Sequence, residues 1–362
     1  MYRLCGLILI CWHVALATNA ARAVETSTPM LETDIGGVHV QAAKLFATTG
    51  QVGLLGRDGR LWSVPPQSLG NPVWSHDPFR PYTASDMKSR LEKEMGDRFE
   101  VVNTRHFVVA FPRGQRDVWP QRFEDLYTAC VHYFSVRGFT PTEPEFPMVA
   151  IVWHNRDEFH QAAQREGTKI GEEIIGFYWQ VSNRLMMYDL GNAARGKNWR
   201  ETAETIIHEA THQTAFNVGI HRRFTPTPSW VGEGLATMFE AKGVYDAHDF
   251  PERANRVNTS RLAEFRQFQK TKRTKDSIQD LLTSDRRFQE NPSGAYAEAW
   301  ALTFFLVETM PREYAKYLQI TAERLVFQTY SPADRYADFV SVFGQDFTML
   351  DARLTRFINE LK

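Results

Sequence analysis

The sequence contains little cysteine: Cys5, Cys11 and Cys130 are the only three in 362 residues. Because we expect residues 1–23 to be removed, only Cys130 would remain, and a single thiol cannot form an intramolecular disulfide. The formal net charge is −1 at pH 7, so the charge balance does not favour binding to nucleic acid or to an anionic membrane surface. After the N-terminal segment, no stretch has the ~20 apolar residues that a membrane-spanning helix needs. The composition therefore predicts a globular domain without disulfides.

Residues 1–23 have the pattern of a secretory signal peptide. Arg3 supplies the basic start, residues 4–17 form an apolar run, and Ala21-Arg22-Ala23 has the small-x-small pattern of a cleavage site, with a cut after Ala20 as the alternative. A retained membrane anchor is the competing interpretation, but the apolar run is shorter than a bilayer requires. We expect a soluble exported protein, periplasmic or extracellular, with no stable membrane anchor after cleavage.

The rest of the chain divides into three parts with different patterns. Residues 24–75 are expected to form a loose leader and a small β-hairpin appendage, because Asp58-Gly59 separates two short strand patterns at 51–55 and 60–64. Residues 85–198 alternate strand and helix patterns, which predicts an α/β sheet subdomain. Residues 199–362 are almost entirely helical in pattern. The predicted fold class is therefore α+β, with a mixed β-sheet subdomain followed by a mostly helical subdomain.

One short motif near the start of the helical part indicates a chemical function. Residues 208–212 read His208-Glu209-Ala210-Thr211-His212. The surrounding segment 199–218 contains no proline or glycine and repeats apolar residues every three or four positions, which predicts a helix that Gly219 ends. On a helix, two imidazoles four positions apart lie on one face and can bind one metal ion. The pattern is the H-E-x-x-H zinc signature, in which the glutamate takes a proton from the attacking water.

A catalytic zinc ion usually has three protein ligands and one open position, so a third ligand must be found. The extended signature with a third histidine is excluded, because its glycine and histidine positions are Ala215 and Val218 here. Glu233, 21 positions after His212, is the better candidate, in the segment Trp230-Val231-Gly232-Glu233-Gly234-Leu235-Ala236. His221 and His248 are the alternatives.

The two segments resemble the zincin-like gluzincin metallopeptidases, especially their aminopeptidase branch, and uncharacterised exported bacterial proteins described as peptidase-MA-like. The resemblance implies one Zn²⁺ ion held by His208, His212 and Glu233, with Glu209 as the general base. It further implies that the active site lies between the sheet subdomain and the helical, catalytic subdomain. It also implies that Tyr296, in Gly294-Ala295-Tyr296-Ala297-Glu298, stabilises the oxyanion; the alternative is an ordinary half-buried helix tyrosine. Glu240, two helical turns after Glu233, could accept the free N–H of a ligand histidine or could be a solvated carboxylate.

The sequence also departs from that family. In aminopeptidases a glutamate before the signature binds the free amine of the substrate, but the corresponding segment here, residues 176–180, has Trp179 at that position and contains no carboxylate. Thermolysin-type enzymes have Asp where Thr237 stands. We therefore expect a zinc metallopeptidase that acts on a peptide or protein substrate as an endopeptidase more than as an aminopeptidase. The alternatives are an inactive, zinc-stabilised binding or scaffold protein and a hydrolase of non-peptide amides or esters.

Overall fold

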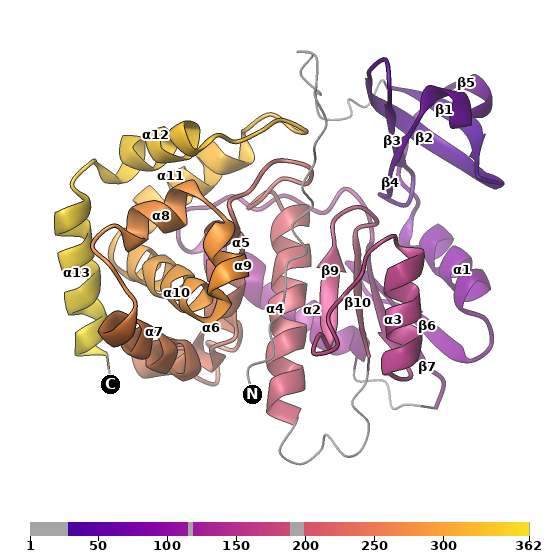
Figure 1. The fold of residues 1–362 in the computed structure, drawn as a ribbon. Coiled ribbons are helices and arrows are strands. Elements are labelled where there is room, and N and C mark those ends of the chain that lie inside the picture. Colours follow the sequence, from indigo (N-terminus) through magenta and orange to yellow (C-terminus); the bar gives the residue numbers. More distant parts are fainter. Residues whose placement is uncertain (1–27, 115–118, 189–198, 362) are drawn as a thin grey trace.

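The computed structural model describes residues 28–114, 119–188 and 199–361, and the expected signal peptide lies outside these residues. Within them the fold is α+β, as predicted: two β-sheets come first and a helical part follows (Figure 1). None of the described helices is long and apolar enough to cross a bilayer.

The N-terminal sheet has five strands, which is more than the hairpin that the sequence predicted. The strands are β1 (Pro29–Ile35), β2 (Val38–Ala47), β3 (Val52–Gly56), β4 (Leu61–Val64) and β5 (Gly70–Pro78). Their order is β4-β3-β2-β1-β5, and all neighbours are antiparallel. The expected hairpin is β3–β4, where Gly59 has a φ of 81°. The expected loose leader is contradicted from Pro29 onward, because β1 occupies that segment and pairs with β5, which runs past the expected end of the appendage at residue 75.

The N-terminal sheet contacts the rest of the protein at its β3–β4 turn. The Leu61 N–H donates to the Val181 carbonyl at 2.7 Å. Arg223 donates from one guanidinium nitrogen to the carbonyls of Gly59 and Gln180, both at 2.6 Å. Because Gln180 and Val181 directly follow strand β9, the appendage is held against the hairpin that borders the candidate site.

The second sheet is mixed and lies between two layers of helices. Its order is β6-β7-β8-β10-β9, with β7, β8 and β10 parallel and both outer pairs antiparallel. Helices α2 and α4 contact one face and α1 and α3 contact the other. Along β7, Val109 and Phe111 enter the core of the first face, and Val108 and Ala110 enter that of the second, as strand alternation requires. The elements of this part are α1 (Ala84–Met95), β6 (Phe99–Asn103), β7 (Phe107–Pro112), α2 (Trp119–Ser135), β8 (Met148–Trp153), α3 (Arg156–Arg165), β9 (Gly176–Trp179) and β10 (Arg184–Tyr188).

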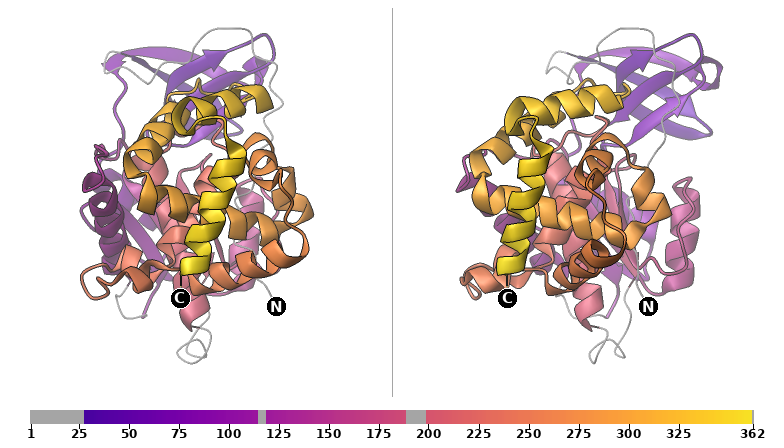
Figure 2. Two further views of the ribbon diagram at one scale, coloured as in Figure 1. Left: turned by 90° about the vertical axis from the view of Figure 1, so that its left-hand side faces the viewer. Right: turned by 60° about the vertical axis from the view of Figure 1, so that its left-hand side comes forward.

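The helical part, which Figure 2 shows in orange to yellow, is built around α10. The residues of α10 from Gly294 to Val307 are all buried. A helix that is apolar on all sides packs neighbours on all sides, and α5, α7, α9, α11 and α13 contact it. Helix α5 approaches most closely: a Cβ atom on Gly234 would lie 2.3 Å from the Thr303 Oγ1 atom and 2.6 Å from the Ala299 carbonyl oxygen. The helices are α4 (Trp199–Asn217), α5 (Ser229–Phe239), α6 (Lys242–Tyr245), α7 (Thr259–Thr271), α8 (Ser277–Thr283), α9 (Arg286–Glu290), α10 (Pro292–Thr309), α11 (Pro311–Ala322), α12 (Pro332–Phe343) and α13 (Phe347–Glu360).

Candidate metal centre

Helix α4 carries the histidine pair in the buried interior of the molecule. The helix ends at Asn217, close to the predicted end, and Gly219 follows with a φ of 82°. The Gln213 side chain donates to the carbonyls of Val149 and Asn183, both at 3.0 Å, and so fixes the helix to the mixed sheet. His208 and His212 are 0% and 1% exposed. Their rings are therefore held in place by packing on every side.

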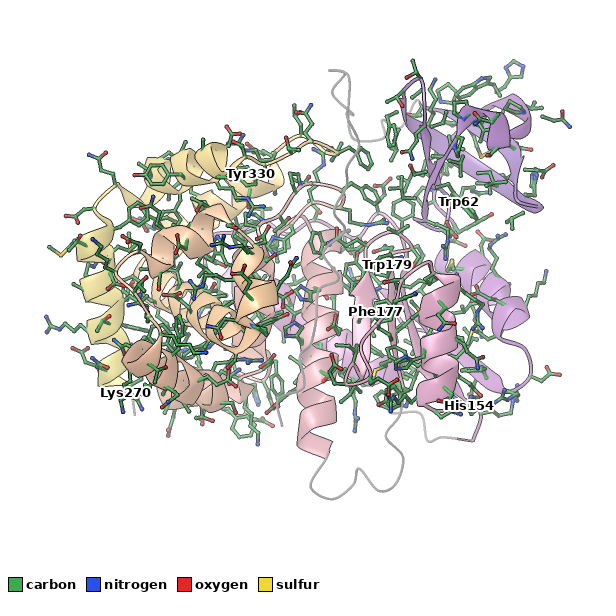
Figure 3. All side chains as sticks on the ribbon, viewed as in Figure 1. Trp62, His154, Phe177, Trp179, Lys270 and Tyr330 are labelled. Carbon is green, nitrogen blue, oxygen red and sulfur yellow. The ribbon has the colours of Figure 1, made fainter. Side chains whose placement is uncertain are left out.

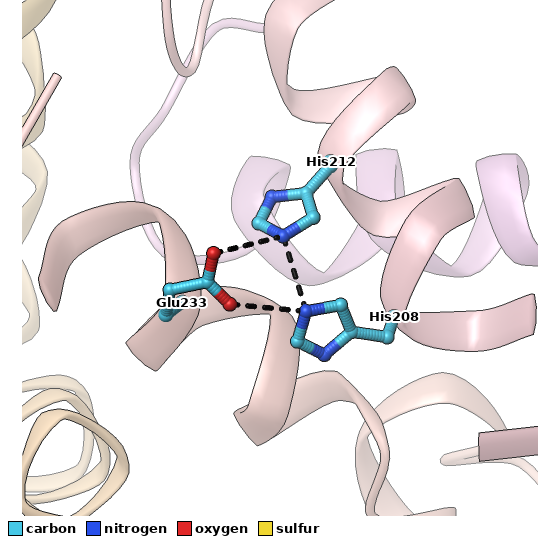
Figure 4. A group of neighbouring side chains, drawn as sticks. All are labelled: His208, His212 and Glu233. Atoms are coloured by element: carbon cyan, nitrogen blue, oxygen red, sulfur yellow. Dashed lines mark hydrogen bonds and ion pairs between the residues drawn. The ribbon is translucent and has the colours of Figure 1, made fainter. Parts of the chain in front are cut away.

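Helix α5 brings Glu233 to the two histidines, as the resemblance implied. The Nε2 atom of His208 lies 3.1 Å from the Glu233 Oε2 atom and 3.1 Å from the His212 Nε2 atom. The His212 Nε2 atom lies 3.8 Å from the Glu233 Oε1 atom. Figure 4 shows the two rings and the carboxylate pointing toward one another. Each residue offers one ligand atom, and these atoms lie within 4.8 Å of one another.

The three side chains fit a zinc ion by their donor types and spacing. Two imidazole nitrogens and a carboxylate oxygen are a donor set that zinc uses, and tetrahedral coordination at ~2.1 Å separates neighbouring ligand atoms by about 3.4 Å. The two observed separations of 3.1 Å are close to that value. In addition, the buried Glu233 Oε1 atom has no hydrogen-bond partner. A cation among the three residues would satisfy these groups, and His208, His212 and Glu233 are the residues that would hold it.

The protonation states of these groups favour metal binding. Burial alone would raise the pKa of Glu233, but the hydrogen bonds and charges of His208 and His212 lower it to about 2. Burial lowers the pKa of His212, although the Glu233 carboxylate partly opposes the effect. To bind a metal ion, a carboxyl group must be ionised and an imidazole must be neutral. Glu233 is therefore ionised, and His212 is biased toward its neutral form.

Glu209 lies on a different side of α4, next to strand β9. Its Oε2 atom accepts a hydrogen bond from the Tyr178 N–H at 2.8 Å, and its buried Oε1 atom has no hydrogen-bond partner. Burial raises the pKa of Glu209 to about 8, with His208 opposing this rise and Glu233 adding to it. A carboxyl group that titrates near neutral pH can both accept and donate a proton. The sequence predicted this residue, but not its backbone partner.

Glu240 follows the last residue of α5 and contacts the far side of the His208 ring. Its Oε1 atom lies 2.8 Å from the His208 Nδ1 atom, and its side chain is 9% exposed. Its other oxygen accepts a hydrogen bond from the Asn258 Nδ2 atom at 2.8 Å. The geometry is that of a partner that orients a ligand histidine. Sequence reasoning missed Asn258, because its contacts with Glu240 and with the Thr237 carbonyl oxygen are tertiary.

Tyr296 and the two alternative histidines are not part of this group of three ligands. Tyr296 lies on α10, is 5% exposed, and packs its ring against Phe288 and the Arg261 guanidinium. His221 is 1% exposed, and neither ring nitrogen has a hydrogen-bond partner. His248 has an almost fully exposed side chain that pairs with Asp249. Among the candidates for the third position, the structure brings Glu233 to the histidine pair.

The comparison with aminopeptidases placed Trp179 where their amine-binding glutamate stands, and the structure contradicts this placement because the side chain points to the other face of the sheet. Strand alternation places Tyr178 on the α4 side, where its ring stacks on Phe216, and sends Phe177 and Trp179 to the opposite face. Figure 3 shows Phe177 and Trp179 on β9. The Trp179 indole is packed in the core on the α3 side and is 8% exposed. Trp179 therefore does not occupy the place of an amine-binding group, and the segment 176–180 supplies no carboxylate.

Comparisons with known proteins give one partial match to a family model and several distant structures. Residues 202–328 match a family described as protein of unknown function (DUF1570). A search of curated proteins found no significant match. An M1 zinc metallopeptidase mutant from Deinococcus radiodurans is similar at a TM-score of 0.40 and 12% identity, over 73% of this chain and 52% of that chain. The same mutant bound to a Tyr-Ser-Ala substrate gives a TM-score of 0.39, 12% identity and coverage of 73% and 52%.

A third structure, a two-domain M1 zinc metallopeptidase mutant bound to L-arginine, gives a TM-score of 0.39 and 11% identity over 72% of this chain and 51% of that chain. This chain thus spans about half the length of the metallopeptidases that it resembles. Independently of that similarity, the described residues contain the buried group His208, His212 and Glu233 with metal-binding spacing.

Proposed function

We propose that this protein is a zinc-dependent metallopeptidase that hydrolyses peptide bonds by activating a water molecule. The observation that carries the proposal is the convergence of His208, His212 and Glu233, three buried ligand atoms with zinc-like spacing. When bound, zinc supplies a Lewis acid that polarises a carbonyl group and makes a water molecule more acidic. The buried Glu209 carboxylate, one residue after the first ligand, supplies the base that this chemistry needs.

Each side chain of the site has a definite task in this proposal. Glu209 accepts the proton of the attacking water and passes it to the leaving nitrogen, and the Tyr178 N–H keeps its carboxylate in one orientation. Glu240 holds the His208 ring so that its Nε2 atom faces Glu233. Tyr296 is the proposed donor to the oxyanion, a role that rests on the family resemblance. A single donor of this kind can be worth ~3 kcal/mol in the transition state.

Endopeptidase activity is favoured over aminopeptidase activity by the strand next to Glu209. Strand β9 is the last strand of its sheet among the described residues. A peptide could pair with such an edge by β-addition along its length, without a requirement for a free end. The segment 176–180 contains no carboxylate to bind a free amine. Peptides with acetylated N-termini should therefore be cleaved as well as peptides with free N-termini. Cleavage only of peptides with free N-termini would identify an aminopeptidase.

We also propose that residues 1–23 direct export.

The substitution Glu209→Gln tests the proposed chemistry. Gln can still accept the Tyr178 N–H but cannot accept a proton, so kcat should fall by about 10² to 10⁴ while the zinc content stays at that of the wild type. Cleavage of a proteome-derived peptide library and metal analysis of both proteins give the two readouts. Turnover that is unchanged in the variant would remove the mechanism. A zinc-loaded wild-type protein that cleaves no peptide would favour an inactive binding protein instead.

A further inference from the structure

We infer that Asn258 is a positioning residue of the metal centre, which acts on His208 through Glu240. The inference rests on the proposed zinc site and extends it to a residue outside the ligand helices. Asn258 precedes α7 and lies 18 positions after Glu240 in the sequence, and its side chain is buried. Its Nδ2 atom donates to the Glu240 Oε2 atom at 2.8 Å, while the Glu240 Oε1 atom lies 2.8 Å from the His208 Nδ1 atom.

The orientation of the Asn258 amide is fixed by its surroundings. The Nδ2 atom faces two acceptors, the Glu240 carboxylate and the Thr237 carbonyl oxygen at 3.0 Å. The Oδ1 atom faces a donor, the Arg261 N–H at 3.2 Å. If the amide were rotated by half a turn, its oxygen would face two acceptors and its NH₂ group would face a donor. Both hydrogens of the amide are thus used, and one of them is directed at Glu240.

The consequence for His208 follows from the inventory of donors and acceptors. The His208 Nε2 atom faces the metal-binding group, so a ligating His208 carries its proton on Nδ1 and donates it to Glu240. The Glu240 carboxylate can rotate unless its second oxygen is also held, and Asn258 holds it. Asn258 therefore restricts the carboxylate, the carboxylate restricts the imidazole ring, and the ring presents Nε2 in one direction.

Asn258 also has a structural role, and the two roles can be separated. Its Oδ1 atom caps the first turn of α7 by accepting the Arg261 N–H. Asn258→Asp keeps an acceptor for this cap, but it removes the donor and places a second acceptor against Glu240 and the Thr237 carbonyl. Asn258→Ser also keeps a capping oxygen and removes the amide N–H that is directed at Glu240, without adding a charge. A variant that weakens the helix cap should be less stable, whereas a variant that lacks the N–H donor to Glu240 should bind zinc more weakly.

The zinc Kd, measured by competition with a chromophoric chelator, is the readout. Catalytic activity is a poorer readout, because the Arg261 side chain packs on the ring of Tyr296. A disturbed helix cap would therefore change activity through Tyr296 as well as through the zinc site. We expect Asn258→Asp to raise the Kd by about 10-fold to 100-fold and Asn258→Ser to raise it less, which is the range for partners of metal-ligating histidines. The matched control is Asn155→Asp, the same change at the exposed N-cap of α3, which should leave the Kd unchanged.

A double-mutant cycle with Glu240→Gln shows whether the effect passes through Glu240. If it does, Asn258→Ser should change the Kd little in the Glu240→Gln background. A wild-type Kd for Asn258→Asp, or an undiminished effect in that background, would overturn the inference. A wild-type protein that does not bind zinc would instead overturn the proposed function, so the two failures can be told apart. Melting temperatures of the metal-free variants identify any loss that comes from the cap alone.

Discussion

Two regions of the helical part bury glutamate side chains, and they balance the charge in different ways. In the first, which we call the arginine cluster, Glu298 contacts Arg273 and Arg287. The Glu298 Oε1 atom accepts from the Arg273 Nε atom and its Oε2 atom accepts from the Arg287 Nη1 atom, both at 2.7 Å. Arg273 also pairs with Asp351. Although Glu298 is 0% exposed, both of its oxygens have cationic partners from the chain itself.

The candidate metal centre buries Glu209 and Glu233 and most of Glu240, and no arginine or lysine among the described residues pairs with them. Between described residues, the ion pairs of Glu233 and Glu240 are made with histidine. One oxygen of Glu209 and one of Glu233 have no hydrogen-bond partner. Burial alone therefore does not distinguish a structural glutamate from a functional one. The distinction is whether the protein supplies the cation itself, and at the metal centre the missing charge is one that a metal ion can provide.

The largest expected effect comes from making the same change in both regions. Glu298→Gln removes the carboxylate that Arg273 and Arg287 share, and of the two only Arg273 retains a second acidic partner among the described residues, Asp351, so the free energy of unfolding should fall by about 3–5 kcal/mol. In the metal-free protein, Glu209→Gln should cost at most about 1 kcal/mol, because Gln retains the acceptor for the Tyr178 N–H and removes a group that is costly to ionise. Urea unfolding at pH 7 with a chelator present measures both. Equal losses would contradict the distinction between the regions.

A smaller loss of stability is expected from a substitution at the contact between α5 and α10, which fixes the position of the helix that carries Glu233. Gly234→Ala would put a Cβ atom 2.6 Å from the Ala299 carbonyl oxygen, so the helices must separate, at a cost of about 1–3 kcal/mol. Gly232→Ala is the matched control on the other side of Glu233, since its Cβ atom would lie 3.7 Å from the His212 Cε1 atom, an ordinary contact. Thermal unfolding of both variants tests this. A Gly234→Ala variant as stable as Gly232→Ala would show that the close crossing is not required.

The sequence predicted those parts of the site whose signals are local. The spacing of apolar residues, the absence of proline and glycine and the position of Gly219 together predicted α4 and the shared face of His208 and His212. The approach of Glu233 depends on how α5 crosses α4, which no local pattern contains, so only the family resemblance indicated it. Asn258 gave no functional signal, because its role depends on Glu240 and on the Thr237 backbone, and both contacts are tertiary.

The N-terminal sheet was underestimated for a related reason. Strand β5 contains Pro72 and ends at Pro78, and most of its residues are exposed, so it lacks the alternation of a half-buried strand. Strand β5, the last strand of this sheet in the sequence, forms because it pairs with β1, the first strand. The β3–β4 hairpin, in contrast, was predicted from its Asp58-Gly59 turn. Local turn chemistry is visible in a sequence, whereas pairing between distant segments is not.

The smallest expected effect concerns His221, a buried titratable group outside both regions. Burial lowers its pKa to about 3, and the charge of His212 adds to this effect. Below pH 6.5 the unfolded chain takes up a proton at this residue that the folded protein does not accept until about pH 3, so stability decreases as the pH falls through this window. The loss is up to about 1.4 kcal/mol per pH unit.

His221→Phe should remove this part of the acid sensitivity, because a neutral ring of similar size fills the site without titrating. Urea unfolding of the chelated protein at pH values from 6.5 to 5.0 measures the slope, with His132→Gln on the exposed surface of α2 as the baseline. A slope that is unchanged in His221→Phe would place the acid sensitivity elsewhere, with the ligand histidines as the next candidates. A smaller decrease of the free energy of unfolding with falling pH would show that protonation of a buried histidine without an ionic partner destabilises the fold. The arginine cluster avoids such a cost because its buried charges are paired with one another.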